Sequence, residues 1–321
     1  MKPNIDSLGR RSRTRPCSTD KRVRLQERDW RWLKAIHCHG PLASSFLLDF
    51  AKPLGTSLKR AQERLGDLFH EANTPHGGPY LTRPAQQFLT IDSRYNRLVY
   101  DLAPAGVKAL KDAGVWQEHS GTKGGPWVHS LMVSSVTASI ELATLGRTEL
   151  TYIPQSAILM RANTSLVCPV SYADPAPKYT VTKSLLPDAL FGLEYHTPKG
   201  SRFRFFAVEA DRGTEPLTSK NQNRKSLMRN LRQYQAYIEG GVYQGHLGLT
   251  APLLVLNVMS NPIRTQKTVA HIERTVSGGM NYQLFQSWDA FAAPFRPPAP
   301  NYDLLFGAWQ RAGHPAISID R

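Results

Sequence analysis

The sequence predicts an α/β (α+β) protein with a small helix-rich N-terminal domain followed by a larger domain of strands and helices. Apolar residues recur at helical spacing from residue 25 to 68, and two strand-like runs follow within the next 35 residues. After residue 126, strand-like runs alternate with helical segments, and no internal repeat is present. These later runs lie at 151–160, 189–196, 202–210 and 252–259. The chain has 321 residues, which suits two domains of ordinary size.

The charge balance indicates a polyanionic partner. Lys and Arg number 40 against 25 for Asp and Glu, which gives a formal net charge of +15. Basic side chains that contact phosphates release condensed counterions, so such a surplus favours nucleic acid. A membrane is the alternative, but the chain has no apolar run of about 18 residues and no signal segment. The three cysteines are widely spaced. We therefore expect a cytoplasmic protein without a membrane span.

The first 24 residues differ in composition from the rest of the chain. They are rich in Arg, Ser and Pro and show no apolar periodicity. We expect residues 1–24 to form a disordered basic arm, which either contacts phosphates or only aids solubility.

Residues 25–115 have the pattern of a winged helix-turn-helix. A first helix carries Trp30, Leu33 and Ile36 on one face and stops at Gly40-Pro41. A second spans 42–50, and a third begins after Thr56 or Ser57, either of which can cap it. Two strands, one from residue 80 and one over 97–102, then form a wing, and a closing helix opens at 103–106.

The third helix would enter the major groove of double-stranded DNA. Its predicted DNA-binding residues are Ser57, Lys59, Arg60, Gln62 and Arg64. Their polar side chains suit phosphates and base edges. A winged helix used for protein docking is the alternative.

Residues 116–126 end in Gly-Gly-Pro and are predicted to be a linker. In the following domain, Asp188 precedes one strand-like run, while Glu209 and Asp211 end the next. If the intervening turn centres on Pro198-Lys199, Asp188 lies opposite Glu209, with Cβ atoms about 5 Å apart. Asp211 shares the face of Glu209 by strand alternation.

Facing carboxylates destabilise a strand pair unless something compensates them. A divalent cation would do so, and hard oxygen ligands favour Mg²⁺ or Mn²⁺. We therefore predict a metal site at Asp188, Glu209 and Asp211. A shift of the hairpin register by one residue would instead place Asp188 and Glu209 on opposite faces of the sheet. As a further alternative, the acids lie at a solvated hairpin edge and simply face water.

A Pro-Asp before one strand and Glu-x-Asp at the end of the next resemble the PD-(D/E)xK nuclease fold, a restriction-endonuclease-like fold. With a winged helix in front and the run 208–215, Val-Glu-Ala-Asp-Arg-Gly-Thr-Glu, the chain resembles the replication-relaxation family of plasmids and mobile elements. This family is related to the MobC class of relaxases. The resemblance covers most of residues 25–275, with the nuclease-like domain at 127–275. Residues 276–321 are left as a C-terminal extension.

The resemblance implies a relaxase or site-specific endonuclease that nicks a transfer or replication origin with Mg²⁺ or Mn²⁺. Asp188 and Glu209 would be catalytic metal ligands. The motif lysine is replaced by Asp211, which would add a ligand, and the basic role would pass to Arg212, Lys220 or, as we favour, Lys225. A tyrosine nucleophile such as Tyr234 is a further alternative.

Two alternative functions involve no catalysis. The chain could be a DNA-binding replication or transfer regulator on a degenerate nuclease fold, which the missing lysine favours. It could also be a scaffold that recruits other transfer or replication proteins.

Overall fold

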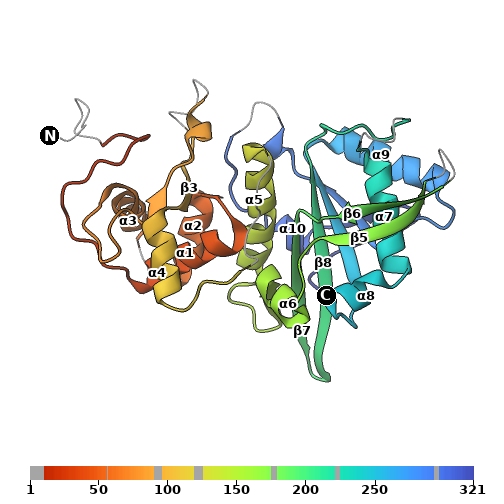
Figure 1. The fold of residues 1–321 in the computed structure, drawn as a ribbon, viewed down its shortest axis with the longest axis horizontal. Coiled ribbons are helices and arrows are strands. Elements are labelled where there is room, and N and C mark those ends of the chain that lie inside the picture. Colours follow the sequence, from red (N-terminus) through yellow and green to blue (C-terminus); the bar gives the residue numbers. More distant parts are fainter. Residues whose placement is uncertain are drawn as a thin grey trace. The chain divides into compact units, whose positions relative to one another are not determined.

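The computed structural model describes residues 11–55, 57–89, 96–118, 126–174, 179–220, 225–292 and 296–321. The chain forms two compact units (Figure 1). Unit 1 comprises residues 1–138 and 296–300, and unit 2 comprises 139–295 and 301–321. The division falls within helix α5 (Trp127–Thr144), after the linker expected at 116–126. None of the described helices is both long enough and apolar enough to cross a membrane.

Unit 1 contains the helices expected from the apolar spacing. The helices are α1 (Glu27–His39), α2 (Ser44–Ala51), α3 (Leu58–His70) and α4 (Pro104–Asp112), with short 3₁₀ helices η1 (Lys52–Leu54) and η2 (Ala85–Phe88). The two expected strands are β2 (Leu81–Thr82) and β3 (Val99–Leu102). A third, β1 (Leu42–Ala43), was not expected, and the antiparallel order is β1-β3-β2. Residues 90–95, between β2 and β3, lie outside the described residues.

Local sequence explains where these helices begin and end. The Gln26 N–H donates to Asp29 Oδ2 at the start of α1, and Gly40 ends the helix with a φ of 100°. Ser57 caps α3 by accepting the Arg60 N–H. Leu33, Ile36 and Leu65 are buried, as the helical spacing predicts, whereas Trp30 is only partly buried and Trp32 is the fully buried tryptophan of α1.

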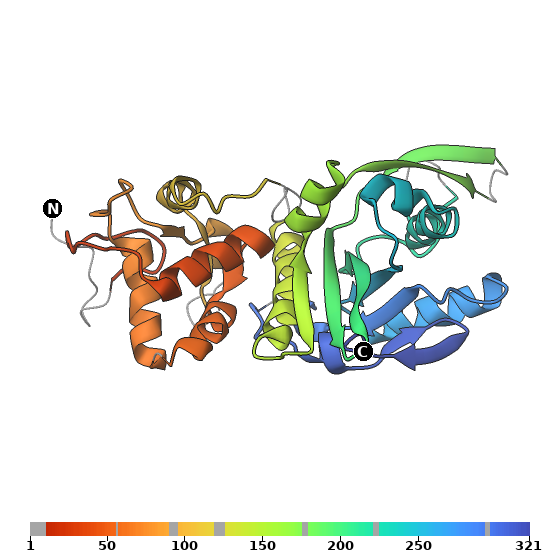
Figure 2. The ribbon, with the colours of Figure 1, turned by 90° about the horizontal axis from the view of Figure 1, so that it is seen from below.

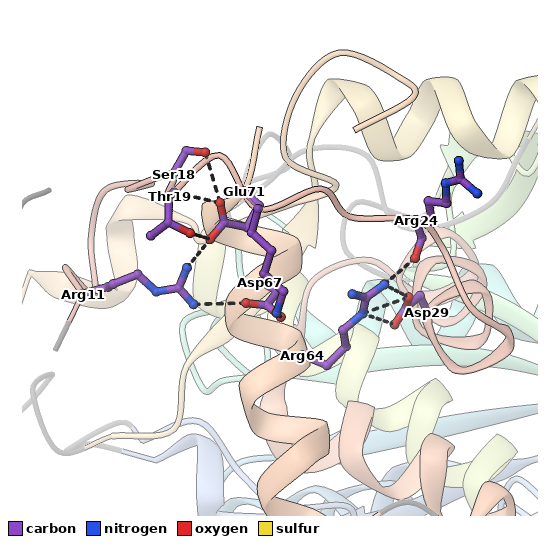
Figure 3. Close-up of polar contacts among 9 residues, drawn as sticks. Arg11, Ser18, Thr19, Arg24, Asp29, Arg64, Asp67 and Glu71 are labelled. Atoms are coloured by element: carbon purple, nitrogen blue, oxygen red, sulfur yellow. Dashed lines mark hydrogen bonds and ion pairs between the residues drawn. The ribbon is translucent and has the colours of Figure 1, made fainter. Parts of the chain in front are cut away.

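The N-terminal segment differs from the disordered arm that we expected. Residues 11–24 lie against α3 (Figure 3), while residues 1–10 lie outside the described part of the chain. The Cys17 N–H donates to His70 Nδ1 at 3.1 Å, the Val23 N–H donates to the Asn73 carbonyl at 3.0 Å, and the Val23 side chain is fully buried. Long-range polar contacts therefore order a segment that has no apolar periodicity.

Unit 2 is built on a seven-stranded sheet of order β12-β11-β10-β9-β8-β7-β4. β8, β9 and β10 are parallel to one another, and the other neighbours are antiparallel. The strands are β4 (Leu150–Pro154), β7 (Ala189–Thr197), β8 (Gly200–Asp211), β9 (Leu253–Met259), β10 (Gln283–Ser287), β11 (Trp309–Arg311) and β12 (His314–Ile317). The expected C-terminal extension thus contributes three strands to the sheet.

The remaining elements of unit 2 connect these strands. They are α6 (Gln155–Ala162), the antiparallel ribbon β5 (Cys168–Asp174) and β6 (Tyr179–Leu185), α7 (Leu227–Glu239), α8 (Val242–Leu247), α9 (Pro262–Thr275), η4 (Asp289–Phe291) and α10 (Asp303–Phe306). The strand predicted at 151–160 was only half right. It ends at Pro154, because proline cannot donate to a ladder, and 155–162 are helical.

Helices α7 and α9 cover the same face of the sheet (Figures 1 and 2). Phe205 and Ala207 of β8 pack in one cluster with Tyr234 of α7. Leu231 of α7 and Ile272 of α9 share a second cluster with β9 and β10. Because strand residues alternate, Glu209 and Asp211 continue the face of Phe205 and Ala207. The acidic side chains therefore lie on the α7 and α9 side.

Candidate functional site

The β7–β8 hairpin has the predicted register. Thr197 pairs with Gly200 across a two-residue turn, and Ala189 pairs with Val208 at the other end. Asp188 directly precedes this last pair and lies close enough to Glu209 for its charge to act on that carboxylate. The Asp188 N–H donates to the Val208 carbonyl at 3.0 Å, and the Ala210 N–H donates to Asp188 Oδ2 at 2.8 Å. These two bonds fix Asp188 at the start of β7.

Glu209 is held by helix α7. The Tyr234 hydroxyl donates to Glu209 Oε1 at 2.5 Å, and the Asn230 side chain also bonds to this carboxylate. Burial raises the pKa of Glu209 well above its ordinary value, and the nearby charge of Asp188 raises it further. The bonds from Tyr234 and Asn230 offset only part of this effect. Ionisation of both Asp188 and Glu209 is therefore unfavourable, unless a cation binds beside them or one of the two carboxylates takes up a proton.

Asp211 lies on the same strand as Glu209 but has a different partner. Arg264, in the first turn of α9, donates from Nε to Asp211 Oδ2 at 2.7 Å. The Gly213 N–H donates to Asp211 Oδ1 at 2.6 Å. Arg264 also donates from Nη2 to the Glu215 carbonyl at 2.6 Å. The Arg264 side chain thus joins the end of β8, which carries Asp211, to the start of α9.

A family model described as Replication-relaxation matches residues 33–253. This chain belongs to the Replication-relaxation family. No curated protein matches the chain, and no solved structure matches it. The matched region contains α3 and all three of the predicted acidic site residues, and the family predicted from the sequence is confirmed. Arg264 lies beyond the matched region.

In this replication-relaxation protein, Asp211 pairs with Arg264 and not with Lys225, the basic residue that the sequence favours. Lys225 is exposed just before α7 and makes no hydrogen bond or ion pair within the described residues, and Lys220 is also exposed. Arg264 contacts one of the acidic site residues, Asp211. Sequence reasoning missed it because 53 residues separate Arg264 from Asp211, and no motif joins them.

Tyr234 is fully buried, and its hydroxyl is bonded to Glu209. Burial raises its pKa well above the ordinary value, and the charge of Glu209 raises it further. A hydroxyl in this position orients the carboxylate. It is poorly placed to attack a phosphate, because attack requires exposure and deprotonation.

The predicted DNA-binding residues of α3 fall into two groups. Ser57, Lys59, Arg60 and Gln62 are exposed, and Ser57 also caps the helix. Arg64 is instead tied to the buried Asp29 of α1, with Nε at 3.1 Å and Nη2 at 2.6 Å from Oδ2, and Nη2 also donates to the Arg24 carbonyl (Figure 3). Arg64 therefore anchors α3, and its charge is already neutralised.

Proposed function

We propose that this chain is a metal-dependent DNA nickase, a relaxase of a plasmid or mobile element that acts at a transfer or replication origin. One observation carries the proposal. Asp188, directly before β7, lies close to Glu209 of β8, and the charge of Asp188 contributes to the raised pKa of Glu209. Facing acids oppose folding, so their presence at one point favours a chemical role.

The topology of unit 2 supports a nuclease of the PD-(D/E)xK type. The order α5, β4, β7, β8, α7, β9 places three antiparallel strands before one parallel strand. In that fold the acids lie at the start of the second strand and near the end of the third, which corresponds to Asp188 and Glu209. Unit 1, with α1, α2, α3 and the β2–β3 pair, has the element order of a winged helix.

The donor set fits Mg²⁺ or Mn²⁺. Asp188 and Glu209 offer hard carboxylate oxygens, and a cation between them would remove the repulsion that raises the pKa of Glu209. Asp211, predicted as a third ligand, would have to exchange Arg264 for the ion. When bound, the ion would polarise the scissile phosphate and acidify a water molecule.

The chain's own residues would prepare this chemistry. Tyr234 and Asn230 hold the Glu209 carboxylate in one orientation. Arg264, held on Asp211 at the position of the motif lysine, would stabilise the negative charge that builds on the phosphate. Lys59, Arg60 and Gln62, on the exposed side of α3, would contact the DNA.

The test is nicking of a supercoiled plasmid that carries the element's own origin, with Mg²⁺ or Mn²⁺ and with or without chelator. We expect wild-type protein to produce open circles only with metal, and Asp188→Asn and Glu209→Gln to lose this activity. Glu194→Gln is the matched control, because Glu194 lies on the same hairpin away from the site. Equal nicking by all four proteins would contradict the assigned site.

A non-catalytic DNA-binding regulator is the second candidate. It is favoured by one observation, namely that Asp211 replaces the motif lysine and is occupied by Arg264. This candidate predicts origin binding without a nick in either metal. Under it, Asp188→Asn and Glu209→Gln would bind origin DNA as tightly as wild type.

A further inference from the structure

A cleft of about 500 Å³ opens next to Asp211, where β8 and β9 end and α9 begins. It lies wholly within unit 2. The lining residues used below are Arg212, Ser260, Asn261, Arg264, Lys267 and Thr268.

The lining of the cleft is strongly cationic. Arg212, Arg264 and Lys267 contribute three positive charges, and no acidic side chain of the described residues lines it. Arg264 is paired with Asp211, whereas Arg212 and Lys267 have no ion pair among the residues that the structure describes. A concave surface of one sign concentrates ions of the opposite sign, so the cleft favours an anion.

The start of α9 adds a partial positive charge but few free donors. Asn261 Oδ1 already accepts the N–H groups of Ile263 and Arg264, at 2.9 Å and 3.2 Å. The helix dipole therefore contributes to the field, while recognition depends on side chains. Lys267 is exposed within the cleft and is free to reach a ligand.

Two buried polar groups in the cleft lack partners within the described structure. Thr268 is 1% exposed and its Oγ1 makes no hydrogen bond. The buried Nε of Arg212 also has none. Buried polar atoms are rarely left unpaired, and a ligand or an ordered water is the usual explanation. Both groups belong to the lining of the same cationic cleft.

We infer that this cleft binds a backbone phosphate of the DNA strand, adjacent to the phosphate that Asp188 and Glu209 would act on. The inference rests on the proposed function for the identity of the ligand. Asp211, which holds Arg264, lies two residues beyond Glu209, a distance of about 7 Å along a strand. Neighbouring phosphates of one DNA strand have a comparable spacing. A single strand that crosses the ends of β8 and β9 would therefore meet both sites.

The test uses thymidine 3′,5′-bisphosphate as a minimal strand and inorganic phosphate as the comparison. Both are titrated calorimetrically into the full chain in EDTA. We expect both probes to bind in the cleft, the bisphosphate no more tightly than phosphate because without a cation Asp188 and Glu209 repel its second phosphate. Arg212→Ala and Lys267→Ala should each weaken binding of both probes about 5- to 10-fold, as for one charge-assisted contact. Arg274→Ala, an exposed cation on the same helix outside the cleft, should bind like wild type. No binding of either probe, or no effect of either cleft variant, would overturn the inference.

Thr268→Val separates a ligand role from a structural one. Removal of an unpaired buried hydroxyl should leave the melting temperature unchanged or raise it, while bisphosphate binding should weaken about 2- to 5-fold. A lower melting temperature with unchanged binding would contradict the inference. Because the titration contains no metal, it is independent of nicking. Lys267-dependent binding without any nicking would support the phosphate-binding cleft and contradict the proposed nuclease activity. Nicking without that binding would support the nuclease activity and contradict the cleft.

Discussion

Buried carboxylates occur in both units, and they are compensated very differently. In unit 1, Glu71 accepts from Arg11 Nη1 at 2.5 Å, from the Thr19 N–H at 2.9 Å and from the Ser18 hydroxyl at 3.1 Å. Burial pushes the pKa of Glu71 upward, but these donors bring it below its ordinary value. In unit 2, burial and Asp188 raise the pKa of Glu209, and Tyr234 and Asn230 do not offset this. The contrast indicates that Glu71 is stabilised as an anion by its donors, whereas the charge of Glu209 is only partly compensated.

The largest expected effect on stability is at the buried ion pair of unit 1. Arg64→Ala should lower the free energy of unfolding by about 3 kcal/mol, because it removes the close cation of the buried Asp29 and leaves only the more distant Arg28 and the Gln26 N–H. Urea unfolding measures the loss. The control is Arg31→Ala, whose exposed pair with Glu27 should contribute less than about 0.5 kcal/mol. Similar losses for both variants would remove the distinction between anchoring and surface pairs.

Acid should weaken unit 1 through His70. Burial, followed by the charges of Arg11 and Arg83, lowers the pKa of His70 from 6.5 to about 4. The folded state therefore resists protonation, and stability is lost as the pH falls from 6.5 towards 4. Between pH 7.5 and pH 5 the loss attributable to His70 should be about 2 kcal/mol.

His70→Asn provides the control for this pH dependence. Its side-chain oxygen can replace Nδ1 as acceptor for the Cys17 N–H, but it does not titrate. Urea unfolding at several pH values should show a flatter acid limb for the variant. Parallel curves for the two proteins would mean that another group causes the acid loss.

Replacing one acid in each unit by its amide should change the stability of the fold in opposite directions. Glu209→Gln should leave the melting temperature unchanged or raise stability by about 1 kcal/mol, because it removes like-charge repulsion. Glu71→Gln should lower stability by about 2 kcal/mol, because it removes a charged acceptor of Arg11. Thermal unfolding in chelator measures both. If Glu209→Gln and Glu71→Gln destabilised the protein equally, the two acids would not differ in the way described above.

The smallest expected effect is on DNA affinity. Lys59→Ala should weaken origin binding by about 1 kcal/mol and reduce the slope of log K against log salt by about 0.9, as for one lost phosphate contact. Lys34→Ala, an exposed lysine on α1, is the charge-matched control. Fluorescence anisotropy at several salt concentrations gives both quantities. Identical slopes for the two variants would exclude Lys59 as a specific phosphate contact.

Sequence predicted the features that depend on local chemistry. The turn at Thr197–Gly200 sets the register of the hairpin, so the sequence alone could predict that Asp188 lies near Glu209. Apolar spacing likewise predicted α1, α2 and α3. The hairpin register depends on residues that are close in the chain, and the helices depend on apolar residues that recur at a fixed spacing.

Contacts between distant segments were not predictable in this way. Arg264 reaches Asp211 from a helix 53 residues away, and Arg11 reaches Glu71 across 60 residues. Ion pairs carry no periodicity, so Arg64 was indistinguishable from its exposed neighbours Lys59 and Arg60. The two-residue strand β1 was too short to show an alternation.

The docking of residues 11–24 on α3 has a consequence for the order of assembly during synthesis. The segment leaves the ribosome before α3, because its acceptors Asp67 and Glu71 are made about 50 residues later. At 5–20 residues per second, the basic segment would wait several seconds before it can pair. During that interval Arg11 is exposed to any polyanion nearby, including ribosomal RNA. Completion of α3 pairs Arg11 with Asp67 and Glu71, whereas Arg13, Arg15, Arg22 and Arg24 stay exposed in the folded chain.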